Sequence, residues 1–152
     1  MQEPNAWVQL AAALAGSAGF ALLFNARGEK LLWASLGGLL SWGVYLLVGL
    51  GYPSDPTRYF LAALVLTVYA EIMARLHKAP VTGFLVAGTI PLIPGGNLYR
   101  SMSAAVAGQW QAALHTGLAT LLLAVAIAAG ILACMVFWHI GTLACRAVSK
   151  FF

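Results

Sequence analysis

Long apolar segments alternate with short polar clusters along this chain of 152 residues. The apolar segments cover residues 6–24, 31–50, 59–76, 81–110 and 112–140. Except for the fourth, each is an unbroken run that reaches or nearly reaches the length of about 20 residues that an α-helix needs to cross a bilayer, and the fifth is clearly longer. The pattern therefore predicts an all-α, polytopic membrane protein of about five transmembrane spans, which form a single transmembrane domain over residues 1–152.

The fourth segment is interrupted near its middle by the sequence PLIPGGNLYR, residues 91–100. Pro91 and Pro94 lack an N–H, and each ring clashes with the carbonyl four residues earlier. The residues before them, Ile90 and Ile93, are expected to leave the helical region of backbone conformation. The sequence therefore predicts that the fourth span is broken between Pro91 and Gly96.

A second half-helix is expected to follow the break. Gly95 and Gly96 permit positive φ, and Asn97 suits the N-cap of a helix that begins at Leu98. The first half, residues 81–91, is about 15 Å long at 1.5 Å per residue, which is half of a hydrocarbon core of roughly 30 Å. The break is therefore predicted near the bilayer midplane.

Composition and charge agree with a membrane protein and orient it. The chain is 62% hydrophobic and only 8% charged, whereas a soluble domain carries about a quarter charged residues. With five spans, one side holds six positive residues and the other holds Arg58 beside Asp55; the six are Arg27, Lys30, Arg75, Lys78, Arg146 and Lys150. A re-entrant fourth segment would weaken this bias. We expect a multi-pass protein of the cell (inner) membrane, for which the positive-inside rule predicts an N-terminus outside and a C-terminus in the cytoplasm.

Other function classes find no support in the sequence. The net charge of +4 reflects membrane orientation, because no soluble basic module is present to bind nucleic acid. Cys134 and Cys145 fit no metal or redox spacing and are interpreted as packing residues. No GxSxG, HExxH or phosphate-binding loop occurs. We therefore expect no enzyme activity, cofactor, metal or nucleic-acid partner.

Arg100 lies in the first turn of the predicted second half-helix, where a cation opposes the helix dipole. A bound anion would compensate, held by the guanidinium and the N–H groups of Leu98 to Arg100. The candidate substrate-binding residues are therefore Gly95, Gly96, Asn97, Leu98, Tyr99, Arg100 and Ser101. A simple proline kink, with Arg100 reaching the interface or paired with a protein carboxylate, is the alternative.

Glu71 is the one acidic residue well inside a predicted span. Thr67, Glu71, Arg75 and Lys78 follow three- and four-residue spacing and so form one polar stripe. Ionisable residues inside a membrane usually face an interior path, which predicts that Glu71, with Arg75 and Thr67, lies on an ion path and accepts a proton or a substrate ammonium. The alternative is an intrahelical pair of Glu71 with Arg75.

Two rows of small residues recur at four-residue spacing, and such rows let helices approach closely in lipid. They are Ala11, Ala15 and Gly19 in the first span, and Ala126, Gly130 and Cys134 in the fifth. Packing within the chain and contact with another chain are both consistent with this pattern.

Residues 69–102, YAEIMARLHKAPVTGFLVAGTIPLIPGGNLYRSM, resemble the threonine/serine exporter family (ThrE), specifically its C-terminal half, which many bacteria make as a separate small subunit. The matching positions are Ala70, Glu71, Ala74, Arg75, Lys78, Pro80, Pro91, Leu92, Pro94, Gly95, Leu98 and Tyr99. The resemblance implies secondary export of threonine and serine, or of dicarboxylates such as succinate, coupled to the proton gradient. It also implies that another half of the transporter lies elsewhere.

We therefore interpret the chain as a membrane subunit of a secondary exporter of small hydrophilic metabolites. Such transporters often pair halves of inverted topology, but the six-to-one charge bias prevents this chain from adopting both orientations. A second membrane subunit is expected, with a like-oriented homo-oligomer as the alternative. A channel lined by the broken helix and a non-catalytic scaffold subunit are the rival functions.

Overall fold

The computed structural model describes the backbone of residues 5–148 and the side chains of residues 5–140. Throughout this part of the chain the regular structure is helical. The elements are α1 (Ala6–Leu23), α2 (Glu29–Gly51), α3 (Asp55–Leu76), α4 (Val81–Thr89), the 3-10 turn η1 (Ile90–Leu92), α5 (Gly95–Val106) and α6 (Trp110–Val148). The prediction of an all-α chain is confirmed.

Four of these helices, α1, α2, α3 and α6, are long and apolar enough to cross a membrane. The segments Val81–Leu92 and Gly95–Val106 together pass the same test and are bent by 55° at the break between them. Counting the bent pair as one crossing gives five spans, so the predicted polytopic fold with a broken fourth helix is confirmed.

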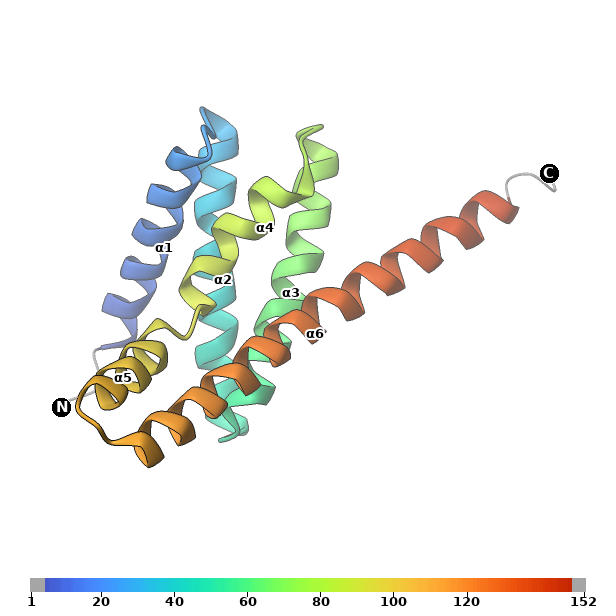
Figure 1. The fold of residues 1–152 in the computed structure, drawn as a ribbon. Helices are drawn as coiled ribbons and strands as arrows, with labels where there is room; N and C mark the ends of the chain where they lie inside the picture. Colours follow the sequence, from blue (N-terminus) through green and yellow to red (C-terminus); the bar gives the residue numbers. More distant parts are fainter. Residues whose placement is uncertain (1–4, 149–152) are drawn as a thin grey trace.

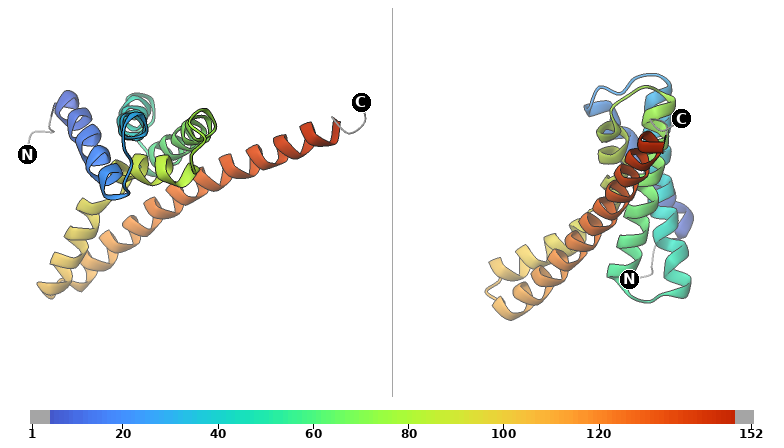
Figure 2. Two further views of the ribbon diagram at one scale, coloured as in Figure 1. Left: turned by 90° about the horizontal axis from the view of Figure 1, so that it is seen from above. Right: turned by 90° about the vertical axis from the view of Figure 1, so that its right-hand side faces the viewer.

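Helices α1, α2 and α3 lie side by side, and α4 packs across α2 and α3 (Figure 1). At the break the chain leaves this group, because α5 packs on the start of α6 instead. Both views in Figure 2 show the hairpin of α5 and α6 projecting from the α1–α3 group. Helix α6 then crosses α3 and continues beyond it.

The chain alternates between the two ends of this arrangement (Figure 1). The α1–α2 and α3–α4 turns and the last turns of α6 lie at one end, and the α2–α3 and α5–α6 turns lie at the other. Arg27 and Lys78 therefore share an end, as five crossings require. The predicted position of Lys150 lies outside the described residues, and the side chains of Cys145 and Arg146 are not described.

Arg58 stabilises the α2–α3 turn at the opposite end. Its Nε donates to the carbonyl of Tyr52 at 2.9 Å and its Nη2 to the carbonyl of Gly49 at 3.2 Å. It also forms an ion pair with Asp55 at 3.4 Å. Carbonyls at a helix C-terminus lack intrahelical donors, so this single arginine satisfies the end of α2. Its role here is structural.

Several helix bounds differ from the predicted segments. Helix α3 begins at Asp55 rather than residue 59, because an acidic residue followed by a proline is well suited to a helix N-terminus. Helix α6 begins at Trp110 and continues to Val148, well past residue 140. Its 39 residues extend about 58 Å at 1.5 Å per residue, which exceeds a bilayer core and fits its inclined course in Figure 1.

The two rows of small residues have different surroundings. Gly130 lies against the backbone of α3, where an added Cβ would be 2.5 Å from the carbonyl oxygen of Phe60, and Cys134 is buried one turn later. The row on α6 therefore packs within the chain. The row on α1 is exposed; its members are Ala11, Ala15 and Gly19.

Candidate functional site

The break in the fourth span begins as a tightened turn rather than as extended chain. Ile90 keeps helical backbone angles, φ −51° and ψ −47°, so the expectation that it leaves the helical region was wrong. Pro91 falls in the first turn of η1, where a missing N–H costs no hydrogen bond. Ile93 is extended, with φ −65° and ψ 120°, and this prediction is confirmed.

The second half-helix starts earlier than the sequence suggested. Helix α5 begins at Gly95 with Pro94 as its N-cap, and Asn97 makes no capping hydrogen bond. The prediction of Asn97 as the N-cap was therefore wrong. Gly95 and Gly96 are helical and do not use positive φ, which among the described glycines occurs at Gly28 and Gly108. A proline fixes φ near the helical value and so initiates the helix in place of the asparagine.

This shift changes which N–H groups are available. The N–H of Leu98 donates to the carbonyl of Pro94 at 3.1 Å, and those of Tyr99 and Arg100 belong to later turns of the helix. The N–H of Gly95 donates to the carbonyl of Ile93 at 2.7 Å. The first turn of a helix leaves its remaining N–H groups without intrahelical acceptors, and in α5 these belong to Gly96 and Asn97.

A buried serine attaches the break to α2. The hydroxyl of Ser41 lies 2.8 Å from the carbonyl oxygen of Gly88 in the last turn of α4, and 3.0 Å from that of Gly38. The N–H of Ile93 donates to the carbonyl of Ile90 at 3.2 Å. Backbone that leaves regular helix inside a membrane must find such partners in protein or water. These hydrogen bonds therefore stabilise the break.

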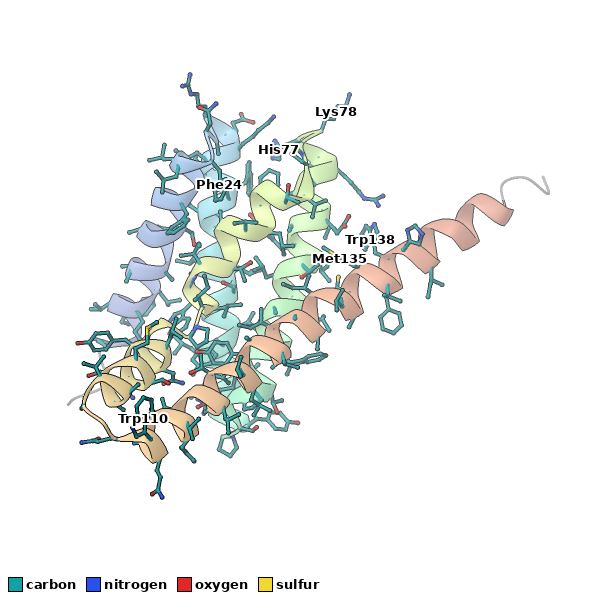
Figure 3. The ribbon with its side chains drawn as sticks, viewed as in Figure 1. Phe24, His77, Lys78, Trp110, Met135 and Trp138 are labelled. Atoms are coloured by element: carbon teal, nitrogen blue, oxygen red, sulfur yellow. The ribbon has the colours of Figure 1, made fainter. Side chains whose placement is uncertain are left out.

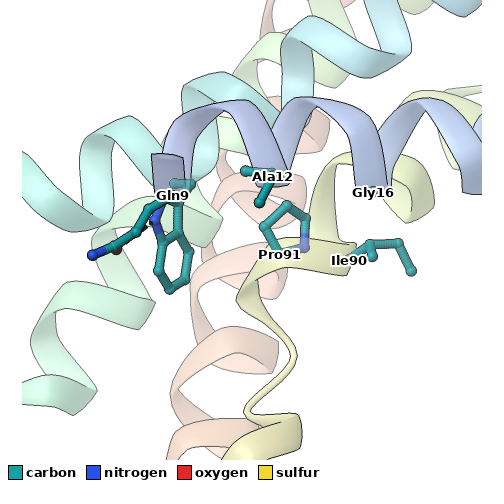
Figure 4. A pocket seen from close by; sticks show the side chains of 7 residues that line it. Gln9, Ala12, Gly16, Ile90 and Pro91 are labelled. Atoms are coloured by element: carbon teal, nitrogen blue, oxygen red, sulfur yellow. Dashed lines mark hydrogen bonds between the residues drawn. The ribbon is translucent and has the colours of Figure 1, made fainter. Parts of the chain in front are cut away.

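A cavity of about 300 Å³ lies beside the break, between α1, α2 and η1 (Figure 4). Trp42 Nε1 donates to Gln9 Oε1 at 3.1 Å at one edge of it. The lining is Gln9, Ala12, Ala13, Gly16, Trp42, Ile90 and Pro91. The sequence singled out Pro91 as part of the helix break, but it did not single out Gln9 or Trp42. The available signal was a single amide side chain inside an otherwise apolar first span.

The predicted substrate-binding stretch is divided by the geometry of α5. Gly95, Gly96, Tyr99 and Arg100 are exposed. On another side of the helix, Leu98 and Ser101 face the start of α6, where the Ser101 hydroxyl donates to the carbonyl of Ala113 at 2.8 Å. Ser101 therefore fixes the α5–α6 hairpin in this structure.

Arg100 has no carboxylate partner among the described residues, whose ion pairs are Arg58 with Asp55 and Arg75 with Glu71. A protein carboxylate therefore does not compensate its charge within this part of the chain. The guanidinium and the two free N–H groups at Gly96 and Asn97 are positive groups of one short helix. Such an end attracts an anion.

Glu71 lies on α3, apart from the cavity, whose lining comes from α1, α2 and η1. Its side chain is 16% exposed, and its Oε2 is 3.8 Å from Nε of Arg75, which is 56% exposed. The Thr67 hydroxyl donates to the carbonyl of Ala63 at 2.7 Å and is buried. The intrahelical ion pair that the sequence allowed is present, but at a distance longer than a charge-assisted hydrogen bond.

These features define a multi-pass membrane protein with a discontinuous helix, an element that many secondary transporters contain. A comparison with known families agrees, since the family described as "Threonine/Serine exporter, ThrE" matches residues 9–137. The chain belongs to the threonine/serine exporter family, a family of transporters rather than enzymes. No solved structure matches the chain.

Proposed function

We propose that this chain is one subunit of a proton-driven secondary exporter in the cell inner membrane, with its N-terminus outside and its C-terminus cytoplasmic. The substrates are threonine- and serine-like amino acids or small dicarboxylates. The observation that carries the proposal is the broken helix, whose second half has free N–H groups at Gly96 and Asn97 about one turn before Arg100, a cation without a carboxylate partner among the described residues. Each of these candidate substrates contains a carboxylate, which this positive end is suited to bind.

In this proposal the cavity beside the break holds the part of a small substrate that lies beyond its carboxylate. Pro91 lines it, and the same chain reaches the first residue of α5 four positions later, at Gly95. With the carboxylate at α5, the short side chain of threonine or serine would enter a mostly apolar space. The polar side-chain groups in its lining are the Gln9 amide and the Trp42 indole N–H, which are hydrogen-bonded to each other in this structure.

A second subunit is proposed because the rest of the chain leaves α5 exposed. None of its residues is buried, and its large apolar side chains are exposed. Arg100 is too polar for lipid at this depth unless protein or water surrounds it. The uncovered residues include Tyr99, Arg100, Met102 and Val106. A partner subunit packed on α5 would enclose the substrate and complete the site.

Reconstitution tests this proposal directly. Proteoliposomes that hold this chain together with its partner subunit are expected to export threonine or succinate against a gradient when a proton gradient is imposed. Liposomes with this chain alone are expected to show no saturable flux, because half of the enclosure is missing. Saturable export by this chain alone would contradict the two-subunit proposal. Transport by the complex that only equalises the substrate concentrations on the two sides of the membrane would indicate a channel.

Glu71 gives the proposal a pH-dependent test. If its carboxylate carries the proton during transport, export by the Glu71→Gln complex should lose its dependence on pH, because glutamine cannot bind and release a proton. The measurement is initial flux across a pH series, with assembly checked by co-purification. A Glu71→Gln complex with the wild-type pH profile would leave Glu71 with a structural role beside Arg75.

A further inference from the structure

Trp138 lies where α6 passes the end of α3 that carries Arg75, and Figure 3 shows it on the side of α6 that faces α3. The guanidinium carbon of Arg75 is 4.7 Å from the centre of its ring. This distance is within the range of a cation–π interaction, for which tryptophan is the best partner. Its Nε1 is buried and has no hydrogen-bond partner in the described part of the chain. The contact of Trp138 with Arg75 is therefore made by the face of its ring.

Arg75 thus interacts with two groups at once. The 3.8 Å between its Nε and the Glu71 carboxylate compares with about 2.7–2.9 Å for a direct charge-assisted hydrogen bond. An arginine fork commonly binds a carboxylate through two such bonds, and this pair makes none. The Glu71 side chain is nevertheless mostly buried, so water cannot readily replace Arg75 as its partner. The arrangement leaves a nearly buried carboxylate with a loosely held counter-charge.

We propose that Trp138 is a positioning residue that holds the Arg75 guanidinium back from Glu71, so that the carboxylate stays available to a proton or a substrate ammonium. The inference rests on the proposed role of Glu71 in transport. Loss of the indole face would let the guanidinium close on the carboxylate. The closed pair would favour ionised Glu71 and compete with any other cation.

Few other charges act on Glu71. Helix α4 has no titratable side chain, and α2 carries Glu29 and Lys30 only in its first turn. On α6 the buried thiol of Cys134 lies within electrostatic reach of Glu71, and His139 follows Trp138 directly. Beyond Arg75 on α3, the His77 ring lies between Trp33 and Phe84, with centroids at 5.8 and 6.3 Å, and Lys78 is exposed. Arg75 is the cation that forms an ion pair with Glu71 in this structure.

Infrared titration of the purified full chain tests the inference without measuring transport. The Glu71 carboxyl band is identified by its loss in Glu71→Gln. In Trp138→Leu the midpoint of this band is expected to move toward lower pH, because an approaching cation stabilises the carboxylate. Trp138→Phe keeps a weaker ring contact and is expected to move the midpoint less. Trp110→Leu, at the exposed start of α6, is the matched control and should leave it in place.

Combination with Arg75→Gln shows whether Trp138 acts through Arg75. In that background Trp138→Leu should produce no further movement of the midpoint. An unchanged midpoint in both Trp138 variants would overturn the inference, and so would a movement that persists without Arg75. If Trp138→Leu does not fold, Trp138→Phe alone decides. Wild-type pH dependence of flux in Glu71→Gln would refute the coupling role of Glu71 while leaving the infrared result standing.

Discussion

Replacement of Arg100 by glutamine is expected to raise the apparent KM for export by about tenfold to a hundredfold, while assembly with the partner subunit is retained. Hydrogen bonds to charged groups contribute about 1.5–3 kcal/mol, and about 1.4 kcal/mol corresponds to a factor of ten. Glutamine keeps a polar side chain but removes the positive charge and the planar fork. Arg100→Lys should recover only part of the loss, because an ammonium cannot bind a carboxylate through two parallel bonds.

The matching substrate experiment uses threonine amide, which lacks the carboxylate. Wild-type complex should strongly prefer threonine over its amide as a competitor for export, and the Arg100→Gln complex should lose most of that preference. Arg27→Gln is the matched control, because it removes an exposed positive charge from the α1–α2 turn, away from the break. Normal KM and normal preference in Arg100→Gln would show that α5 does not bind the carboxylate.

The break itself could be predicted from sequence because its cause is local. Two prolines three residues apart, followed by two glycines, interrupt a helix whatever surrounds them. Besides the conformation of Ile90, the detail that failed was the choice between two helix starts. Asn97 is a good N-cap by its side chain, but Pro94 fixes the backbone of the preceding turn. Backbone restriction prevailed over side-chain capping, and the free N–H groups moved from Leu98–Arg100 to Gly96 and Asn97.

Residues that act through tertiary packing could not be found in this way. The spacing of Glu71 and Arg75 predicts a pair on one helix face, and the pair is present. The contact of Trp138 with Arg75 depends on where α6 crosses α3, which no local pattern encodes. Gln9 and Trp42 meet across α1 and α2 for the same reason. The predicted orientation, substrate stretch and partner subunit stay predictions.

Substitution of Gly130 by alanine is expected to destabilise the folded chain by about 1–3 kcal/mol, the usual cost of overpacking a core. The new Cβ would lie 2.5 Å from the Phe60 carbonyl oxygen, 3.1 Å from Ala63 Cβ and 3.2 Å from the Leu64 nitrogen. Two of these three atoms are backbone of α3, which cannot rotate away as a side chain does. Helices α3 and α6 must therefore separate, and Gly130→Leu is expected to prevent stable folding.

Alanine substitutions at two other glycines serve as comparisons for Gly130→Ala. The measurement is the melting temperature of each purified chain. A Cβ at Gly83 meets nothing within 4 Å, so Gly83→Ala should be neutral or slightly stabilising. At Gly88 it lies 2.4 Å from Leu66 Cδ1, the end of a side chain, and 3.3 Å from the backbone carbonyl carbon of Gly37. Gly88→Ala should therefore cost less than Gly130→Ala. Separation of α3 from α6 would also withdraw Trp138 from Arg75, so Gly130→Ala should move the Glu71 titration in the same direction as Trp138→Leu. Equal melting temperatures for Gly130→Ala and Gly83→Ala would show that the two helices do not depend on this close approach.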